Sequence, residues 1–371
     1  MRILHLDLGR EWRGGQQQVL YLTEGLTRRD HGSLVATPSA SPLDERLLAL
    51  GLPRHPLPVR APRLPRSSLA VHRLLESERW DVIHAHTAHA HTVAAAALHL
   101  IPAPRPSFFV SRRVDFRPGR TPVDRLKYGV GDPHFLCVSD GVRRVMQEWG
   151  VAEDRLTVVH SGVELPAEVE MREDERRALR AELGVPPDRL LIGHIGQLVP
   201  HKGQKFLIEA ASVLSRRGDA MPEPWHLALV GDGPLRAELI SQIASLGLGD
   251  RITLAGHREG ARRFLPVFDL YVSSSVEEGL GTSILDASAH RLAVVATTAG
   301  GSAETVRDGE TGFLVPPADP RALADRIESL LCDPALRQRC GDAGRVFIAA
   351  RFSRDAMVEG TLAAYQRELT L

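Results

Sequence analysis

The feature that most constrains the fold of this chain of 371 residues is a regular alternation between short apolar runs and segments with a helical pattern. The first half contains six such runs: RILHLDL, SLVATP, DVIHAH, SFFVSRR, HFLCVSD and LTVVHSG. The second half contains six more: LLIGHIGQL, WHLALVGDG, RITLAGH, LYVSSS, LAVVATT and GFLVPP. Strands of a parallel sheet are apolar on both sides because helices cover both faces. The pattern therefore predicts an α/β protein with two doubly wound, Rossmann-like domains.

A charged segment divides the two sets of runs. A chain of this length exceeds what one ordinary core accommodates, so two domains are expected. Residues 164–190 contain MREDERRALRAELGVPPD, which predicts a linker and a helix with a solvated charged face. The domains are accordingly predicted at residues 1–165 and 187–352.

One segment of the first half is rich in proline. Residues 51–68 read GLPRHPLPVRAPRLPRSS, with five prolines and four arginines. Prolines at this density predict an irregular, extended surface loop between a helix and the next strand. A second interpretation is that the arginines form a basic rim beside a substrate.

Composition indicates the compartment. The apolar fraction of 43% and the charged fraction of 25% are those of a soluble globular protein, and the first strand follows Met1 with no pattern of a signal peptide. Cys137, Cys332 and Cys340 have neither zinc-site nor disulfide-framework spacing, so we expect a reducing cytoplasm. The first 165 residues carry more basic than acidic residues, a hint of contact with an acidic substrate or an anionic lipid surface.

Glycine-rich turns follow several of the predicted strands. In an open α/β sheet, ligands bind beyond the carboxyl ends of the strands, where glycines let the backbone approach a ligand and helix N-termini favour negative charge. Such turns are Gly14-Gly15, GQLVPHKG at 196–203, VGDGP at 230–234 and EEGLGTS at 277–283. Lys202 lies in the second of these turns and suits a phosphate.

The last of these turns raises a question, because Glu278 is an unexpected neighbour for an anion. Thr282 or Ser283 is predicted to cap the helix that follows, with free amides facing a ligand. Ser283 and Asp286 also have the spacing of a capping box, in which Asp286 would satisfy backbone donors. A ligand-binding role and a capping role for Asp286 therefore both stay open.

Four histidines within eight residues suggest a metal site. They are His84, His86, His89 and His91, and the first two share one face of a predicted strand. No carboxylate or cysteine accompanies them at ligand spacing, so we expect no metal there. A histidine at the strand end, His86, is instead expected near a ligand.

Together these motifs resemble the family 4 glycosyltransferases, which have the GT-B fold of two Rossmann-like domains facing each other across a cleft. The resemblance covers nearly the whole chain: Gly14-Gly15, DVIHAH, CVSDGVRRVMQEWGV, VVHSGVE, IGQLVPHKG, ALVGDGP, SSSVEEGLGTSILDASA and VVATTAGGSAETVRDGETGFLVPPADP. It implies that a nucleotide sugar binds mainly to the second domain and the acceptor mainly to the first. It also implies that a final helix, at about residues 353–371, returns to pack on the first domain.

The resemblance assigns roles to individual residues. Glu278 would bind hydroxyl groups of the donor sugar, Asp286 would bind the nucleotide ribose, and amides around Gly279–Ser283 would receive sugar and diphosphate. The catalytic candidates are Glu278, Lys202, Arg112 and His86. The donor-binding candidates are Gly14, Gly15, Gln197, Gly231, Gly233, His257, Gly279, Leu280, Gly281, Thr282, Ser283 and Asp286.

Three positions depart from the family pattern. Asp286 stands where the family usually has glutamate, and Gln197 stands where it usually has an arginine that meets the diphosphate. A histidine that many relatives carry after the strand SFFVS is replaced here by Ser-Arg-Arg. We expect Arg112 or Arg113 to supply the missing positive charge, the alternative being a weak or altered enzyme.

The implied reaction retains the anomeric configuration and needs no metal or other cofactor. The implied partners are a UDP-, GDP- or ADP-linked sugar and a glycan or glycolipid acceptor of the cell envelope, with peripheral membrane contact and no nucleic acid. The alternatives are a sugar-nucleotide epimerase of the same fold and a non-catalytic nucleotide-sugar-binding partner of another transferase. A dinucleotide dehydrogenase fits poorly because Gly14-Gly15 lacks the third glycine of that fingerprint.

Overall fold

The computed structural model describes residues 1–57, 64–114, 128–167, 171–218 and 224–370, and the chain divides into two compact units. The first unit contains Met1–Gly162 together with Arg354–Leu371, and the second contains Val163–Ser353. The expected domain ends were residues 165 and 352. The charged segment expected as a linker and a helix belongs to the second unit, where its helix α7 (Glu173–Leu183) packs through Leu183 and Leu179.

The first unit is built on a sheet of seven parallel strands in the order β3-β2-β1-β4-β5-β6-β7. The strands are β1 (Arg2–Leu6), β2 (Gly32–Pro38), β3 (Arg54–Leu57), β4 (Val82–Ala85), β5 (Ser107–Arg112), β6 (His134–Cys137) and β7 (Leu156–Val158). The helices are α1 (Gly14–Thr27), α2 (Pro42–Ala49), α3 (Leu64–Ser77), α4 (Ala88–His99), α6 (Asp140–Trp149) and α13 (Arg354–Thr370), with a short 3-10 helix η1 (Glu153–Arg155). Ser139 and Thr87 accept hydrogen bonds from first-turn amides and so fix where α6 and α4 begin.

The proline-rich segment is not an irregular loop where the structure describes it, so that expectation was wrong. Strand β3 and the first turns of α3 both lie within residues 51–68, of which 58–63 fall outside the described residues. Pro56 is tolerated because β3 is an edge strand that pairs only with β2 among the described strands. Pro65 is tolerated because it occupies the first turn of α3, where its missing amide hydrogen has no intrahelical partner.

The second unit is built on six parallel strands in the order β10-β9-β8-β11-β12-β13. The strands are β8 (Leu190–Ile195), β9 (Trp225–Val230), β10 (Ile252–Gly256), β11 (Leu270–Ser273), β12 (Ala293–Thr297) and β13 (Gly312–Val315). Besides α7, the helices are α8 (Gln204–Arg216), α9 (Arg236–Ser245), α10 (Thr282–Ala289), α11 (Pro320–Cys332) and α12 (Pro334–Arg351), with 3-10 helices η2 (Pro200–Lys202), η4 (Ala261–Val267) and η5 (Gly300–Glu304).

Alternate residues of these strands enter two separate cores. Leu227 and Leu229 of β9 pack on one face with α8, α9 and α11, whereas Ala228 and Val230 pack on the other with η4 and α10. Successive side chains of a strand point to opposite faces, so both faces must be apolar when both are covered. This explains the near-continuous apolar runs in the sequence.

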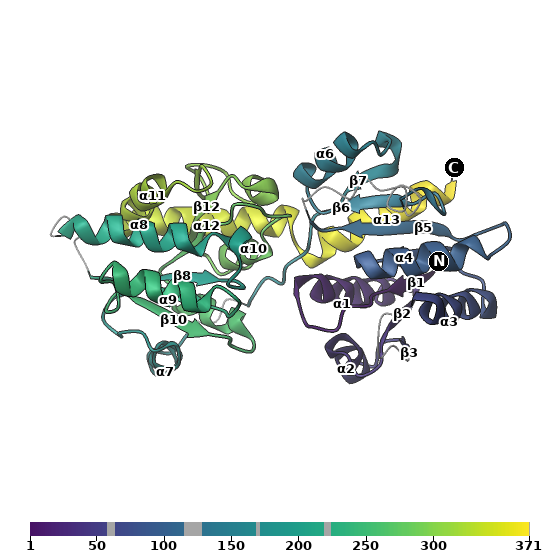
Figure 1. Cartoon of the computed structure of the whole chain (residues 1–371), viewed down its shortest axis with the longest axis horizontal. Coiled ribbons are helices and arrows are strands. Elements are labelled where there is room, and N and C mark those ends of the chain that lie inside the picture. The colour runs from purple at the N-terminus through teal and green to yellow at the C-terminus, as the bar shows by residue number, and fades with distance from the viewer. Residues whose placement is uncertain (58–63, 115–127, 168–170, 219–223, 371) are drawn as a thin grey trace. The chain divides into compact units, whose positions relative to one another are not determined.

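The last helix returns to the first unit. Met357, Val358, Leu362 and Tyr365 of α13 pack in the core of that unit, and the helix lies beside its strands and α1 (Figure 1). At Gly25 of α1 a Cβ atom would lie 2.4 Å from Val358, so the two helices approach too closely there for any side chain. Among the described residues no helix is long and apolar enough to cross a membrane.

Candidate donor and acceptor sites

The central site of the second unit lies where the order of its strands reverses direction. From β8 the chain proceeds outward through β9 to β10, whereas β11 lies on the other side of β8 and leads to β12 and β13. Lys202 follows β8 and Glu278 follows β11, and their side chains form an ion pair at this point. Ligands of open α/β sheets bind at such a switch point.

The glycine turns hold this region together by close backbone contact. A Cβ atom on Gly203 would lie 2.1 Å from the carbonyl oxygen of Ser274, and one on Gly231 would lie 1.9 Å from that of Gly196. The backbone amide of Leu198 donates to the backbone carbonyl oxygen of Asp232 at 3.0 Å. The turns after β8, β9 and β11 therefore form one packed surface, as the sequence suggested.

Both members of the ion pair are largely buried. The side chain of Lys202 is 21% exposed and that of Glu278 is 14% exposed. The hydroxyl of Ser275 donates to the Glu278 carboxylate at 3.2 Å, and the amide of Val276 donates to the carbonyl of His201 at 2.8 Å. The pair combines an ammonium suited to phosphate with a carboxylate suited to hydroxyl groups, and each neutralises the other without a ligand.

Helix α10 begins at Gly281, not at the expected side-chain caps. Gly281 is the N-cap, with a φ of +83°, and no described side chain caps the helix. Thr282 and Ser283 are therefore the first two helical residues and not caps, which excludes the capping-box alternative that was left open for Ser283 and Asp286. The backbone oxygen of Gly281 already accepts from the amides of Ile284 and Leu285, so the helix starts too early for Ser283 to be a cap. The amides of Thr282 and Ser283, at the very start of the helix, lie before the first intrahelical hydrogen bond.

Asp286 instead lies in the middle of α10 and pairs with an arginine. Arg262 Nε lies 2.8 Å from Asp286 Oδ2, and Asp286 is only 7% exposed. Burial raises the pKa of Asp286 to about 6, although Arg262 acts in the opposite direction. The carboxylate is thus ionised above about pH 6.

The remaining donor-binding candidates lie on the same edge of the sheet. Gln197 and His257 are exposed, directly after the turns that end β8 and β10. Gly233 donates its amide to the side chain of Asp232 at 2.7 Å. Leu280 is buried and anchors the turn before α10 from inside.

Two residues that the sequence analysis missed support this edge. The side-chain amide of Gln204 donates to the backbone oxygen of Gln197 at 2.8 Å, and His194 contacts the Val272 carbonyl at 2.9 Å through Nδ1. Burial lowers the pKa of His194 to about 4, so it is neutral at pH 7. A polar residue in the first turn of α8, directly after the Gly203 turn, was the available signal for Gln204.

The first unit has its own switch point, between β1 and β4. Gly14 and Gly15, expected to lie where a helix opens after the first strand, are the first two residues of α1 and present its N-terminus. Gln16 donates to the buried carboxylate of Asp7 at 3.1 Å, and Asp7 in turn accepts from the amide of Gly9 at 2.7 Å. Burial raises the pKa of Asp7.

Arg112 is the last residue of β5 and Arg113 follows it directly. Their side chains point to opposite faces, because successive residues of a strand alternate. Arg112 is buried and donates to the hydroxyl of Tyr128 at 3.4 Å. Arg113 lies beside the N-terminus of α1: its Cδ is 3.9 Å from the position that a Cβ atom on Gly15 would occupy. Burial lowers the pKa of Arg113 to about 10, so it remains charged at pH 7. Of the two arginines, Arg113 is therefore the better candidate for a ligand contact.

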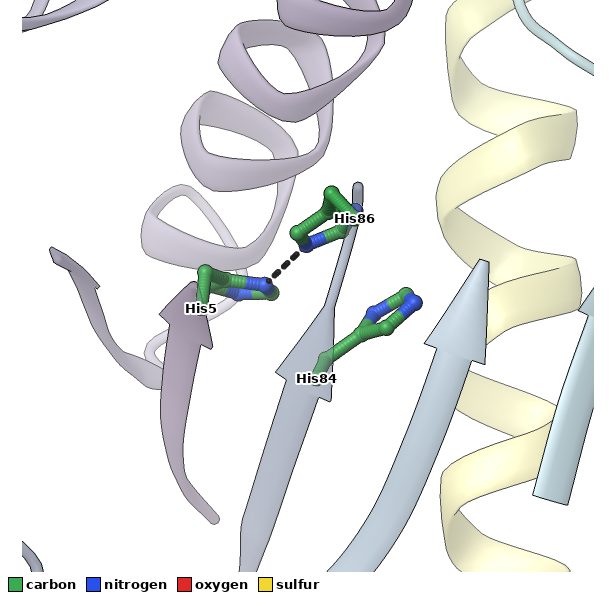
Figure 2. A group of neighbouring side chains, drawn as sticks. All are labelled: His5, His84 and His86. Atoms are coloured by element: carbon green, nitrogen blue, oxygen red, sulfur yellow. Dashed lines mark hydrogen bonds between the residues drawn. The ribbon is translucent and has the colours of Figure 1, made fainter. Parts of the chain in front are cut away.

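Three buried histidines meet at the first switch point. Figure 2 shows His5 of β1 bonded to His86, which follows β4, with His84 of β4 beside them. The ligand atoms of all three lie within 4.8 Å of one another, which makes them a conceivable metal site. Of the other two histidines in the motif, His89 is exposed on α4 and His91 is buried among aromatic rings.

Two family models match this chain, one mainly in each unit. Residues 12–166 match the family Glycosyltransferase Family 4, and residues 175–347 match Glycosyl transferases group 1. The chain is 30% identical over 270 residues to the lipopolysaccharide core biosynthesis glycosyltransferase LpsE of Rhizobium meliloti (strain 1021), covering 72% of this chain and 73% of that protein. It is 34% identical over 236 residues to alpha-D-kanosaminyltransferase of Streptomyces kanamyceticus, covering 62% of this chain and 58% of that protein.

A solved structure with the same fold is that of Anabaena HepE in complex with UDP-glucose. It superimposes with a TM-score of 0.82 at 23% sequence identity, over 98% of this chain and 100% of that chain. The similarity covers both units.

Proposed function

The chain belongs to the family 4 glycosyltransferases, and we propose that it moves a sugar from a nucleoside diphosphate to a hydroxyl group of a glycan or glycolipid, with retention of anomeric configuration and without a metal ion. The observation that carries this proposal is the ion pair of Lys202 and Glu278 at the switch point of the second unit. A diphosphate attracts the ammonium, and sugar hydroxyl groups donate to the carboxylate.

The leaving group is the charge that the site has to stabilise. The bond between the anomeric carbon and the diphosphate oxygen breaks, and the acceptor oxygen bonds to the same face of that carbon. Lys202 and the first-turn amides of α10 stabilise the charge that develops on the diphosphate, and this preorganised stabilisation is commonly the largest contribution to catalysis. The diphosphate then takes the proton of the acceptor hydroxyl, so no protein nucleophile is needed.

Asp286 is assigned to the nucleotide ribose. Its carboxylate is buried, ionised at neutral pH and held by Arg262, so it is positioned to accept hydrogen bonds. Its side chain is one methylene shorter than the glutamate usual in the family.

The substrate class is proposed from the relatives. LpsE is named for lipopolysaccharide core biosynthesis, and HepE was crystallised with UDP-glucose. We assign this chain a UDP-, GDP- or ADP-linked donor and an envelope glycan or glycolipid acceptor. A glycolipid acceptor places the protein at the cytoplasmic face of a membrane as a peripheral enzyme.

Product analysis tests the proposal. Proton NMR of the product should show the anomeric configuration of the donor, and treatment with EDTA should leave turnover unchanged. An inverted product would contradict the proposed stereochemistry. Activity that EDTA abolishes and Mg²⁺ or Mn²⁺ restores would contradict metal independence.

A further inference from the structure

A continuous chain of hydrogen bonds runs through the interior of the first unit. The Tyr365 hydroxyl lies 2.6 Å from His84 Nδ1, and His84 Nε2 lies 2.8 Å from Ser111 Oγ. Ser111 Oγ lies 3.3 Å from His86 Nδ1, and His86 Nε2 lies 3.0 Å from His5 Nδ1. Figure 2 shows His84 turned toward β5 and α13, which carry the two hydroxyl groups.

The three histidines in this chain are neutral. Burial lowers the pKa of His5 to about 3 and takes the pKa of His84 and of His86 well below 6.5, with the charge of Arg113 lowering the last two further. A neutral imidazole carries one N–H group and one lone pair. The chain can therefore point in only one of two directions at a time.

The direction follows from counting unsatisfied groups. If Tyr365 donates to His84, then His84 donates to Ser111, Ser111 donates to His86, and His86 donates to His5. Only the N–H at His5 Nε2 is then without an acceptor among the described residues. In the opposite direction the lone pair at His5 Nε2 is unsatisfied, and the Tyr365 hydroxyl also lacks an acceptor. A buried unsatisfied polar group is costly, so the first direction, with Tyr365 as donor, is favoured.

This direction determines what Ser111 offers. Its oxygen accepts from His84 and its hydrogen goes to His86, which leaves one lone pair on the oxygen. Ser111 also lines a cavity of about 20 Å³, together with His84, Arg113 and His160. That volume accommodates roughly one water-sized oxygen. Arg113 Nε is buried and has no hydrogen-bond partner among the described residues, so the cavity also borders a donor.

We propose that this cavity is a subsite for one hydroxyl group of the sugar acceptor. The hydroxyl donates to Ser111 and accepts from Arg113, and a water takes its place when the acceptor is absent. Tyr365, His84, His86 and His5 are positioning residues that fix the direction in which Ser111 presents its lone pair. This subsite rests on the proposed function, which places the acceptor on the first unit.

Two other uses of the histidines fit less well. A metal needs lone pairs from all three rings at about 2.0–2.1 Å, whereas the nitrogens are already engaged with one another, with Ser111 and with Tyr365. A general base needs a pKa near the working pH, whereas burial takes the pKa of each histidine far below 6.5. Orienting a neutral hydroxyl needs neither property.

The direction of the chain is tested without any substrate. Nitrogen-15 NMR of the full-length protein should show His5, His84 and His86 all as the Nε2–H tautomer. Tyr365→Phe removes the donor that favours this direction, so it should give a mixture of both tautomers at all three histidines. Thr157→Val is the matched control, because Thr157 is the hydroxyl partner of His134 at 2.8 Å on β6 and β7. It should change His134 alone. Three Nδ1–H tautomers would overturn the proposed direction.

Occupancy is tested by crystallography at high resolution. An oxygen should lie within hydrogen-bond distance of Ser111 Oγ and Arg113, and it should be absent in Ser111→Val. An empty cavity in the wild type, or a metal ion bound by the three histidines, would overturn the subsite.

Kinetics separate this subsite from the function on which it rests. Methyl glycosides and glycerol serve as hydroxyl-bearing probes, added to a donor that the wild type hydrolyses. Ser111→Ala should raise the KM of an accepted probe about three- to tenfold, the effect of one lost hydrogen bond, while donor KM and hydrolysis stay unchanged. Ser111→Thr should restore the KM in part. An unchanged probe KM in Ser111→Ala, or no response of the wild type to any probe, would overturn the subsite; failure to consume any donor would instead overturn the proposed function.

Discussion

Lys202 and Glu278, 76 positions apart in the sequence, form an ion pair where β8 and β11 end side by side. This pairing explains how a carboxylate can stand beside a turn built to receive an anion. Lys202 cancels the charge of Glu278 while the site is empty. A bound diphosphate would take over part of the ammonium and leave the carboxylate to the sugar hydroxyls.

The pairing predicts that the two residues are energetically coupled. Lys202→Ala should weaken UDP binding at least tenfold, because Glu278 loses its ammonium and remains a largely buried negative charge beside the diphosphate. Adding Glu278→Gln should recover part of that loss, with a coupling free energy of about 0.5–3 kcal/mol. Calorimetry on the two single variants and the double variant measures this coupling. Additive effects would show that the pair has no influence on the nucleotide.

The buried carboxylate of Asp286 should make the affinity for UDP depend on pH. Asp286→Asn should weaken UDP binding at pH 7.5, because an ionised carboxylate accepts hydrogen bonds from ribose hydroxyls more strongly than an amide does. Since burial raises the pKa of Asp286 to about 6, wild-type affinity should fall more steeply than that of the variant between pH 7.5 and 5. Any pH dependence of the affinity that remains in Asp286→Asn comes from protonation of the nucleotide phosphates. Parallel curves for the two proteins would contradict the ribose assignment.

The buried histidines predict a loss of stability in acid. Burial lowers the pKa of His5 from 6.5 to about 3 and that of His194 from 6.5 to about 4. The unfolded chain therefore binds more protons than the fold below pH 6.5, so the free energy of unfolding falls as pH drops from 6.5 toward 4. Asp286 acts oppositely between pH 3.8 and about 6, and Asp7, whose pKa burial also raises, acts in the same sense as Asp286. The histidines outweigh these two carboxyl groups, because burial also lowers the pKa of His84, His86 and His226. Urea unfolding at pH 7, 6 and 5 should show a falling midpoint; a constant or rising one would disagree.

We still predict that Arg113 is the second cation for the diphosphate, through guanidinium nitrogens other than the Nε on which the acceptor subsite rests. The motif around Gln197 supplies only one cation, Lys202. Arg113→Ala should therefore lower turnover about ten- to hundredfold, the effect of losing a charge-assisted bond of about 1.5–3 kcal/mol. Gln197→Arg should restore part of this loss. Arg112→Ala is the comparison, since Arg112 lies on the opposite face of β5, bonded to Tyr128. Normal turnover in Arg113→Ala would remove it from the mechanism.

Apart from β3, the strands could be predicted because each lies in a short segment rich in apolar residues, as in LALV of β9, whose residues are all buried. Strand β3 could not, because Arg54-His-Pro-Leu has one buried residue and lies at the edge of the sheet. Its strand conformation depends on pairing with β2, which no local pattern reveals.

The family motifs placed Lys202 and Glu278 in one site, whereas their direct contact depends on the neighbouring positions of β8 and β11. The start of α10 was misjudged because side-chain caps are read from sequence more easily than a glycine N-cap with positive φ. The chain from Tyr365 to His5 joins four segments distant in sequence, so it emerges only once α13 packs on the first sheet.

The central claim is that the chain transfers a sugar from a nucleotide sugar through Glu278 and Lys202. It is tested most directly by measuring nucleoside diphosphate release from UDP-, GDP- and ADP-linked sugars, with wild type and Glu278→Gln side by side and UDP affinity measured for both. The account predicts that the wild type consumes one class of donor. It predicts that Glu278→Gln lowers turnover at least a hundredfold, which corresponds to roughly 2.7 kcal/mol of transition-state stabilisation. The variant should bind free nucleoside diphosphate at least as tightly as the wild type does. Equal turnover in the two proteins, or equal loss of turnover and nucleotide affinity in the variant, would contradict it.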